Sequence, residues 1–239
     1  SIEGDPDQLS RDSGKVWFGD LVDKGIIAEE KLKNIASTTA KLLLKDKAIA
    51  LPAVQDNKPR IVFISLSDGK SAARVFRGQA RGIIPAVKQA IAKSHQYLGN
   101  SPLSPTEITI DYAVGVTNHI RVTEQKKLSL PSYRWGISLP RGSDIAFPPG
   151  EVYGHGFINH QHHFDVDQVS GYLESQGRFT RGIKSNLESF PVQPRRFRTI
   201  DYYSSGEGVR RMQAGRFPVD EISSRRLLNA VRRAGQYLA

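Results

Sequence analysis

The sequence contains no cysteine, which excludes disulfide bonds, thiolate metal sites and cysteine nucleophiles. It has no run of about 18 apolar residues, so it does not predict a membrane span. It also lacks a Gly-x-Ser-x-Gly motif, and nothing in it selects a pair of carboxylates for glycoside cleavage. The composition of the whole chain, with 38% hydrophobic and 24% charged residues, is typical of a globular protein. The absence of cysteine fits a cytoplasmic bacterial protein and a periplasmic or secreted one equally well.

Positive charge is concentrated in the last part of the chain. Residues 1–177 hold 21 Lys or Arg against 19 Asp or Glu, whereas residues 178–239 hold 13 against 5. Because this change is abrupt, we place a domain boundary there. The predicted organisation is a loose arm over 1–15, an α+β domain over 16–177, a basic irregular segment over 178–219, and a C-terminal helix over 220–239 that is a candidate start of a further helical domain.

The hydrophobic pattern of the α+β domain predicts a mainly antiparallel sheet packed with two or three helices. The expected strands alternate in polarity, and hairpin turns outnumber the helical crossovers that a parallel sheet needs. The expected strands are 61–66 and 71–76 around an Asp-Gly turn, 107–116 with a polar face that includes Asp111, and two short strands within 136–150. The expected helices cover 29–47, 83–98 and 165–175.

Several of these segments resemble a known family. The strand at 62–66 is followed by Arg77-Gly78, and the Pro-Leu-Ser-Pro turn at 102–105 precedes a strand with Ile108, Ile110 and Tyr112. Over about residues 29–175 this order is similar to the AMME-chromosomal-region (AMMECR-type) domain, which implies an α+β fold. That family's Leu-Arg-Gly-Cys-Ile-Gly motif is replaced here by residues 75–80, so a function tied to its cysteine does not carry over.

The predicted C-terminal helix resembles the first helix of an α/α toroid, a fold found in glycan-processing enzymes. One helix cannot form a toroid, so the resemblance implies that the chain is a module of a longer protein. With the absence of a catalytic motif, this predicts an accessory, non-catalytic module of a larger bacterial protein that takes part in glycan processing. The expected partner is a further domain or another protein at the C-terminal end.

A histidine-rich stretch supports a second hypothesis. In a strand, His160 and His162 share one face, which is suitable geometry for two imidazole ligands of a Zn²⁺ or similar cation. His155, His163 or Asp165 is a candidate to complete such a site. The function would then be that of a metal-dependent hydrolase with a divalent metal as cofactor. The alternative is that these histidines pack and hydrogen-bond without an ion.

Two arginine-containing segments are candidates for binding anions. Arg77, Gly78, Arg81 and Gly82 precede a predicted helix, and backbone N–H groups at a helix start bind phosphate or carboxylate; the alternative is a solvated loop. The second segment combines arginine forks for phosphates with aromatic rings that stack on bases, which predicts single-stranded nucleic acid as an alternative partner. Its candidate residues are Arg195, Arg196, Arg198, Tyr202 and Tyr203. An acidic protein surface would fit the same residues.

We expect metal analysis of the purified, untagged protein to find far less than one equivalent of any transition metal. The histidines stand beside Phe157, Phe164 and Val166, where imidazole can bury an apolar face and hydrogen-bond through its ring nitrogens without an ion. A full equivalent of metal that disappears when His160 and His162 are both changed to alanine would establish the metal site instead.

Overall fold

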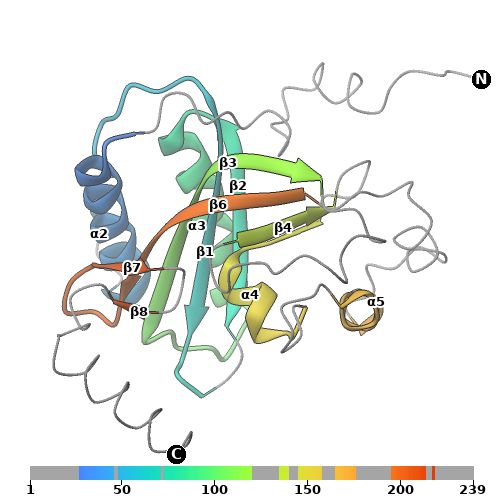
Figure 1. The fold of residues 1–239 in the computed structure, drawn as a ribbon. Coiled ribbons are helices and arrows are strands. Elements are labelled where there is room, and N and C mark those ends of the chain that lie inside the picture. Colours follow the sequence, from blue (N-terminus) through green and yellow to red (C-terminus); the bar gives the residue numbers. More distant parts are fainter. Residues whose placement is uncertain are drawn as a thin grey trace, which may run out of the picture.

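The computed structural model describes residues 27–45, 48–70, 73–119, 135–139, 145–157, 165–175, 195–213 and 217–218. These residues form one antiparallel sheet with helices on both of its faces (Figure 1). The strands are β1 Pro59–Ser67, β2 Arg74–Arg81, β3 Glu107–His119, β4 Trp135–Leu139, β5 Ile145–Phe147, β6 Arg195–Ser204, β7 Arg210–Gln213 and β8 Phe217–Pro218. The helices are α2 Glu29–Lys45, α3 Ile83–Leu98, α4 Pro149–Gly154 and α5 Val166–Ser175.

The strand order along the sheet is β2-β1-β3-β6-β4-β5, and β7 and β8 continue from β6. Every pairing is antiparallel, so the predicted α+β class with a mainly antiparallel sheet is confirmed. The predicted hairpin, the helices at 29–47, 83–98 and 165–175, and the short strands within 136–150 all have counterparts. No helix among the described residues is long and apolar enough to cross a membrane.

Two segments differ from the sequence-based prediction. Residues 77–82 were expected to form a loop, but all except Gly82 belong to strand β2. The segment 178–219 was expected to be irregular, yet it supplies β6, which lies inside the sheet between β3 and β4. The α+β domain therefore takes strands from both sides of the predicted boundary at residue 177. The predicted helix at 220–239 lies outside the described residues.

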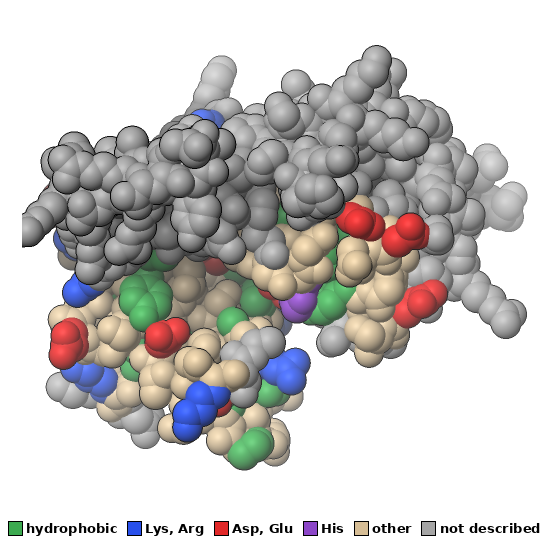
Figure 2. Space-filling view, turned by 60° about the horizontal axis from the view of Figure 1, so that its bottom comes forward, with side chains coloured by type: hydrophobic (Ala, Val, Ile, Leu, Met, Phe, Trp, Pro, Cys, Tyr) green, Lys and Arg blue, Asp and Glu red, His purple; other side chains and the backbone are tan. Residues whose placement is uncertain are grey.

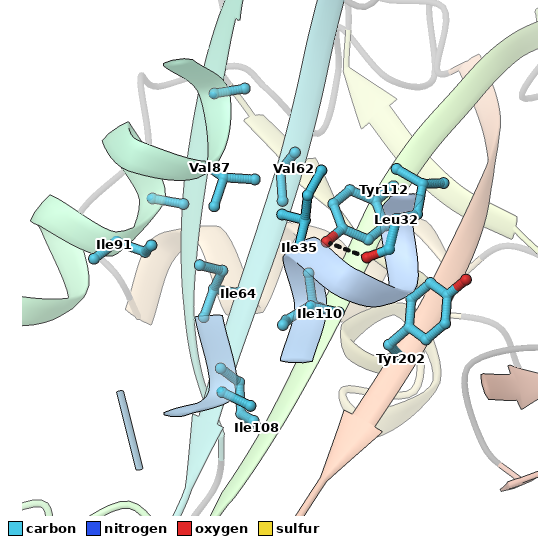
Figure 3. Packing of buried hydrophobic residues seen from close by; sticks show 14 of the residues in the cluster. Leu32, Ile35, Val62, Ile64, Val87, Ile91, Ile108, Ile110, Tyr112 and Tyr202 are labelled. Carbon is cyan, nitrogen blue, oxygen red and sulfur yellow. Dashed lines mark hydrogen bonds between the residues drawn. The ribbon is translucent and has the colours of Figure 1, made fainter. Parts of the chain in front are cut away.

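One face of the sheet packs against α2 and α3 and forms the main hydrophobic core (Figure 3). In an antiparallel strand alternate side chains point to the same face, and each central strand presents a row of apolar residues here. The buried side chains that meet in this core include Leu32, Ile35, Val62, Ile64, Val87, Ile91, Ile108, Ile110, Tyr112 and Tyr202.

Two tyrosines hold the first turn of α2 on this face. The hydroxyl of Tyr112 donates a hydrogen bond to the carbonyl oxygen of Leu32 at 3.2 Å. The hydroxyl of Tyr202 donates to the carbonyl oxygen of Glu29 at 3.0 Å. The two rings meet edge to face with centroids 6.1 Å apart, so β3 and β6 position the helix together.

Gly78 allows α3 to lie directly on β2. A Cβ atom at this position would stand 1.8 Å from the carbonyl oxygen of Ala86, a backbone atom of α3. The outer edge of β2 is also covered by this helix, because Gln89 accepts a hydrogen bond from the backbone N–H of Gln79 and Lys93 donates to the carbonyl oxygen of Arg77. The glycine of this segment therefore serves helix–strand packing, and helix side chains protect an exposed sheet edge.

We expect Gly78→Ala to lower the free energy of unfolding by about 1–3 kcal/mol, because the added methyl group must push α3 away from the sheet. Gly171→Ala is the matched control, since a Cβ at this position in α5 meets no atom within 4 Å. Replacing a helical glycine by alanine should stabilise the protein by about 0.5–1 kcal/mol. Urea titration measures both, and an unchanged midpoint for Gly78→Ala would contradict the close packing.

Candidate functional site

A pair of buried aspartates lies on the opposite face of the sheet from α2 and α3. Asp111 of β3 stands directly opposite Asp201 of β6 in the antiparallel register. Both residues are almost fully buried, with exposed fractions of 3% and 2%. Strand alternation explains the arrangement, because Tyr112 and Tyr202, the next residue of each strand, then point into the main core.

The two carboxyl groups lie within reach of each other, and a hydrogen bond between them requires a proton on one of them. Burial raises the pKa of Asp111 well above its ordinary range, and the charge and hydrogen bond of Asp201 raise it further. The negative charge of Glu151 acts in the same direction. Asp111 therefore holds its proton at pH values at which an exposed aspartate is ionised, and the pair contains both a proton donor and a proton acceptor.

Asp111 lines a cavity of about 310 Å³ between the sheet and α4. The volume lies at the lower end of the range of about 300–1,000 Å³ that is typical of small-molecule sites. The sheet contributes Ser65, Val75, Thr109 and Asp111, and Ala73 directly precedes β2. The segment of α4 contributes Gly150, Glu151, Gly154 and His155. Figure 2 shows the lower side of the molecule, where a histidine side chain lies in a recess beside hydrophobic and acidic side chains.

His155 is held at the wall of this cavity by two aromatic rings. Its ring centroid lies 4.2 Å from that of Tyr172 and 5.5 Å from that of Phe157. Its Nε2 atom is 3.9 Å from Oε1 of Glu151, one helical turn earlier. Burial lowers the pKa of His155, so the imidazole is neutral near pH 7 and can either accept or donate a proton.

The histidine-rich stretch is described only in part. His160, His162 and His163 lie outside the described residues, so the predicted metal site stays a prediction. Asp165 caps helix α5, because its Oδ1 atom accepts a hydrogen bond from the backbone N–H of Gln168 at 3.0 Å. Within the part of the chain that the structure describes, no group of three or more metal-ligating side chains is assembled.

The helix start after residues 77–82 already holds a carboxylate from the protein itself. Oδ2 of Asp56 accepts a hydrogen bond from the backbone N–H of Ile83 at 2.9 Å and contacts Nε of Arg60 at 2.7 Å. Burial alone would raise the pKa of Asp56, but the hydrogen bonds and charge of Arg60, together with backbone N–H groups, lower it. An anion predicted at this helix start would therefore have to displace Asp56.

The predicted arginine and tyrosine strip is divided between the two faces of β6. Tyr202 is buried in the main core and Tyr203 points to the other face, so the two rings do not meet one ligand. Burial removes Tyr202 from base stacking, and the guanidinium carbon of Arg211 lies 5.5 Å from its ring centroid. Arg198 is exposed, whereas nothing is described of the side chains of Arg195 and Arg196.

The aspartate pair was missed by the sequence analysis, which placed Asp111 on the polar face of a half-buried strand. A local signal was present, because the tetrapeptide Thr-Ile-Asp-Tyr occurs at 109–112 and again at 199–202. In the antiparallel register, the two copies pair around their aspartates. The repeated tetrapeptide is therefore the sequence signal that could have pointed to this pairing.

Comparison with known proteins gives no identification. No family model and no curated protein matches the chain. Among solved structures, the chain is similar to the uncharacterized protein PH0010 from Pyrococcus horikoshii, with 11% sequence identity and a TM-score of 0.48. The match covers 75% of this chain and 96% of that one, and it carries no argument about function. The AMMECR-type resemblance stays a prediction.

We expect Asp111→Asn to raise the free energy of unfolding at pH 7 by about 1–3 kcal/mol, because a neutral amide can donate to Asp201 without keeping a buried acid. Below the ordinary pKa of 3.8, Asp111 is protonated in both the folded and the unfolded state, so its burial does not lower stability. As the pH rises toward the raised pKa of the folded state, the unfolded state loses its proton first, and the wild-type protein becomes less stable. The difference between variant and wild type should therefore vanish near pH 4. Urea titrations between pH 4 and 8 measure it, and a difference independent of pH would contradict the shift.

Proposed function

We propose that this protein is an enzyme that transfers protons to and from a small polar substrate held in the cavity between the sheet and α4. The observation that carries the proposal is the aspartate pair, in which two facing buried carboxyls share a proton and one of them, Asp111, lines the cavity. A carboxyl that keeps its proton near neutral pH can act as a general acid, and its partner can act as a base.

The cost of burying the pair favours a functional role over a structural one. Each carboxyl loses its hydration inside the protein, and a buried ionic group is often replaced without loss of stability by apolar side chains. Ala113 and Phe197, on the same face of the same two strands, show that apolar residues pack well here. Strongly shifted pKa values that combine burial with a specific charged partner are concentrated at active sites.

The walls of the cavity indicate the kind of substrate. Asp111 and Glu151 bring carboxyl groups, Ser65 and Thr109 bring hydroxyl groups, and no lysine or arginine is among the described lining residues. This lining favours a substrate with hydroxyl or amino groups over an anionic one. His155, kept neutral by burial, is placed to exchange protons between the substrate and solvent.

The test incubates the wild-type protein with a mixture of small amino and hydroxy compounds and follows each of them by NMR. We expect at least one compound to be consumed, and we expect Asp111→Asn and Asp201→Asn to reduce this turnover by about 100-fold or more, as for the loss of a general acid or base. Glu30→Gln is the matched control, because Glu30 is exposed on α2 at the other face of the sheet. Turnover that survives both aspartate changes would contradict the proposal.

The accessory module predicted from the sequence gives a different result in the same experiment. A non-catalytic module would bind a compound in the cavity and lose that binding in Asp111→Asn, but it would not consume the compound. The nucleic-acid alternative predicts neither result. It requires affinity for single strands that falls steeply with salt, because each phosphate contact releases counterions.

A further inference from the structure

A second cavity lies on the other side of the sheet, outside the main core. It has a volume of about 930 Å³, and we call it the apolar groove. One wall is the stripe Ile84, Lys88, Ile91, Ala92 and His95 of α3, and the other is the extended segment 49–55 together with Leu42 of α2. Because α2 and α3 cover the face of the sheet opposite to Asp111, the groove is separate from the cavity that contains Asp111.

The surface of the groove is aliphatic and partly exposed to water. Leu42, Leu51, Val54 and Ile84 are half-buried, and Ile49 is 38% exposed. Among the described residues Ile49 is the only large hydrophobic side chain classed as exposed. An apolar patch of this kind on an otherwise charged surface is typical of a binding site, because covering it removes apolar area from water.

Two features of the lining define the chemistry of the occupant. Lys88 and His95 are the only titratable side chains among the described lining residues, both on α3, and no acidic side chain accompanies them. The lining also contains no tryptophan, tyrosine, phenylalanine or arginine, which are the residues that dominate protein–protein contacts. An aliphatic surface with a cationic group therefore fits an alkyl chain with an anionic head better than it fits a protein partner.

We propose that the apolar groove binds long-chain alkyl carboxylates, with the chain along the stripe of α3 and the carboxylate beside Lys88. From Lys88 to His95 the helix rises by about 10 Å, so methylene groups that extend from a carboxylate beside Lys88 can lie along Ile91 and Ala92. The ammonium of Lys88 donates hydrogen bonds to the carboxylate, and the aliphatic side chains cover the methylene groups. This site does not depend on the proposed enzymatic function.

Calorimetric titration of the whole chain with octanoate, decanoate and dodecanoate, each below its micelle concentration, tests this site. Burial of one methylene group stabilises a complex by enough to raise affinity about fourfold, so affinity should rise steeply along this series. Dodecyltrimethylammonium, which has the same chain and the opposite charge, should bind at least about tenfold more weakly than dodecanoate. Equal binding of the two amphiphiles, or no binding of dodecanoate, overturns the proposal.

Substitutions locate the site. Lys88→Glu and Ala92→Glu each place a carboxylate at an exposed position of the groove, and both should weaken dodecanoate binding at least about tenfold. Lys31→Glu on α2 makes the same charge change outside the groove lining and is the matched control. Unchanged thermal unfolding shows that each variant is folded. A loss confined to Lys88→Glu, or equal losses in all three variants, would mean that charge alone accounts for binding and overturns the proposal.

Discussion

The pairing of β3 with β6 is the constraint on which the rest of the structure depends. The register that sets Asp111 opposite Asp201 also places Tyr112 and Tyr202 on the opposite face, where they hold the first turn of α2. Side chains alternate along a strand, so a slip of one residue in either strand would turn its aspartate into the main core and its tyrosine away from the helix. One set of backbone hydrogen bonds therefore determines both the packing of α2 and the geometry of the candidate site.

The two faces of the sheet contribute differently to stability. The face under α2 and α3 is packed mainly with apolar side chains, and the buried hydroxyls of Thr39 and Ser94 donate hydrogen bonds to their own helices. Contacts as close as that of Gly78 with Ala86 leave no room for even one methyl group. The other face holds a buried acid pair and a cavity, both of which cost free energy. A protein can retain such a face when the other one is packed densely, because net stability is a small difference between large terms.

The parts of the fold that could be predicted from the sequence are those with a local pattern. Helices α2 and α3 follow from apolar residues at helical spacing, and the β1–β2 hairpin follows from Asp68-Gly69 between two apolar runs. Strand β6 was missed because the arginines around Phe197 obscure its alternation. The aspartate pair was missed because its two members are 90 positions apart, and the hydrophobic pattern of a single strand does not report which strand becomes its neighbour.

The charge boundary near residue 177 illustrates the same difficulty in physical terms. Charged residues lie mainly on the surface, whereas a domain is defined by the hydrophobic core that it buries. A change in charge along the sequence therefore does not locate a domain boundary. In β6, Arg198 is exposed while Phe197, Ile200 and Tyr202 are buried, so a strand inside the sheet carries the composition of a basic tail. The buried acid pair is thus completed by a strand from the most basic part of the chain. The net charge of +10 is a sum over the whole surface of the chain, most of which lies away from the cavity. It therefore does not describe the electrostatic potential around a substrate that is bound beside Asp111 and Glu151.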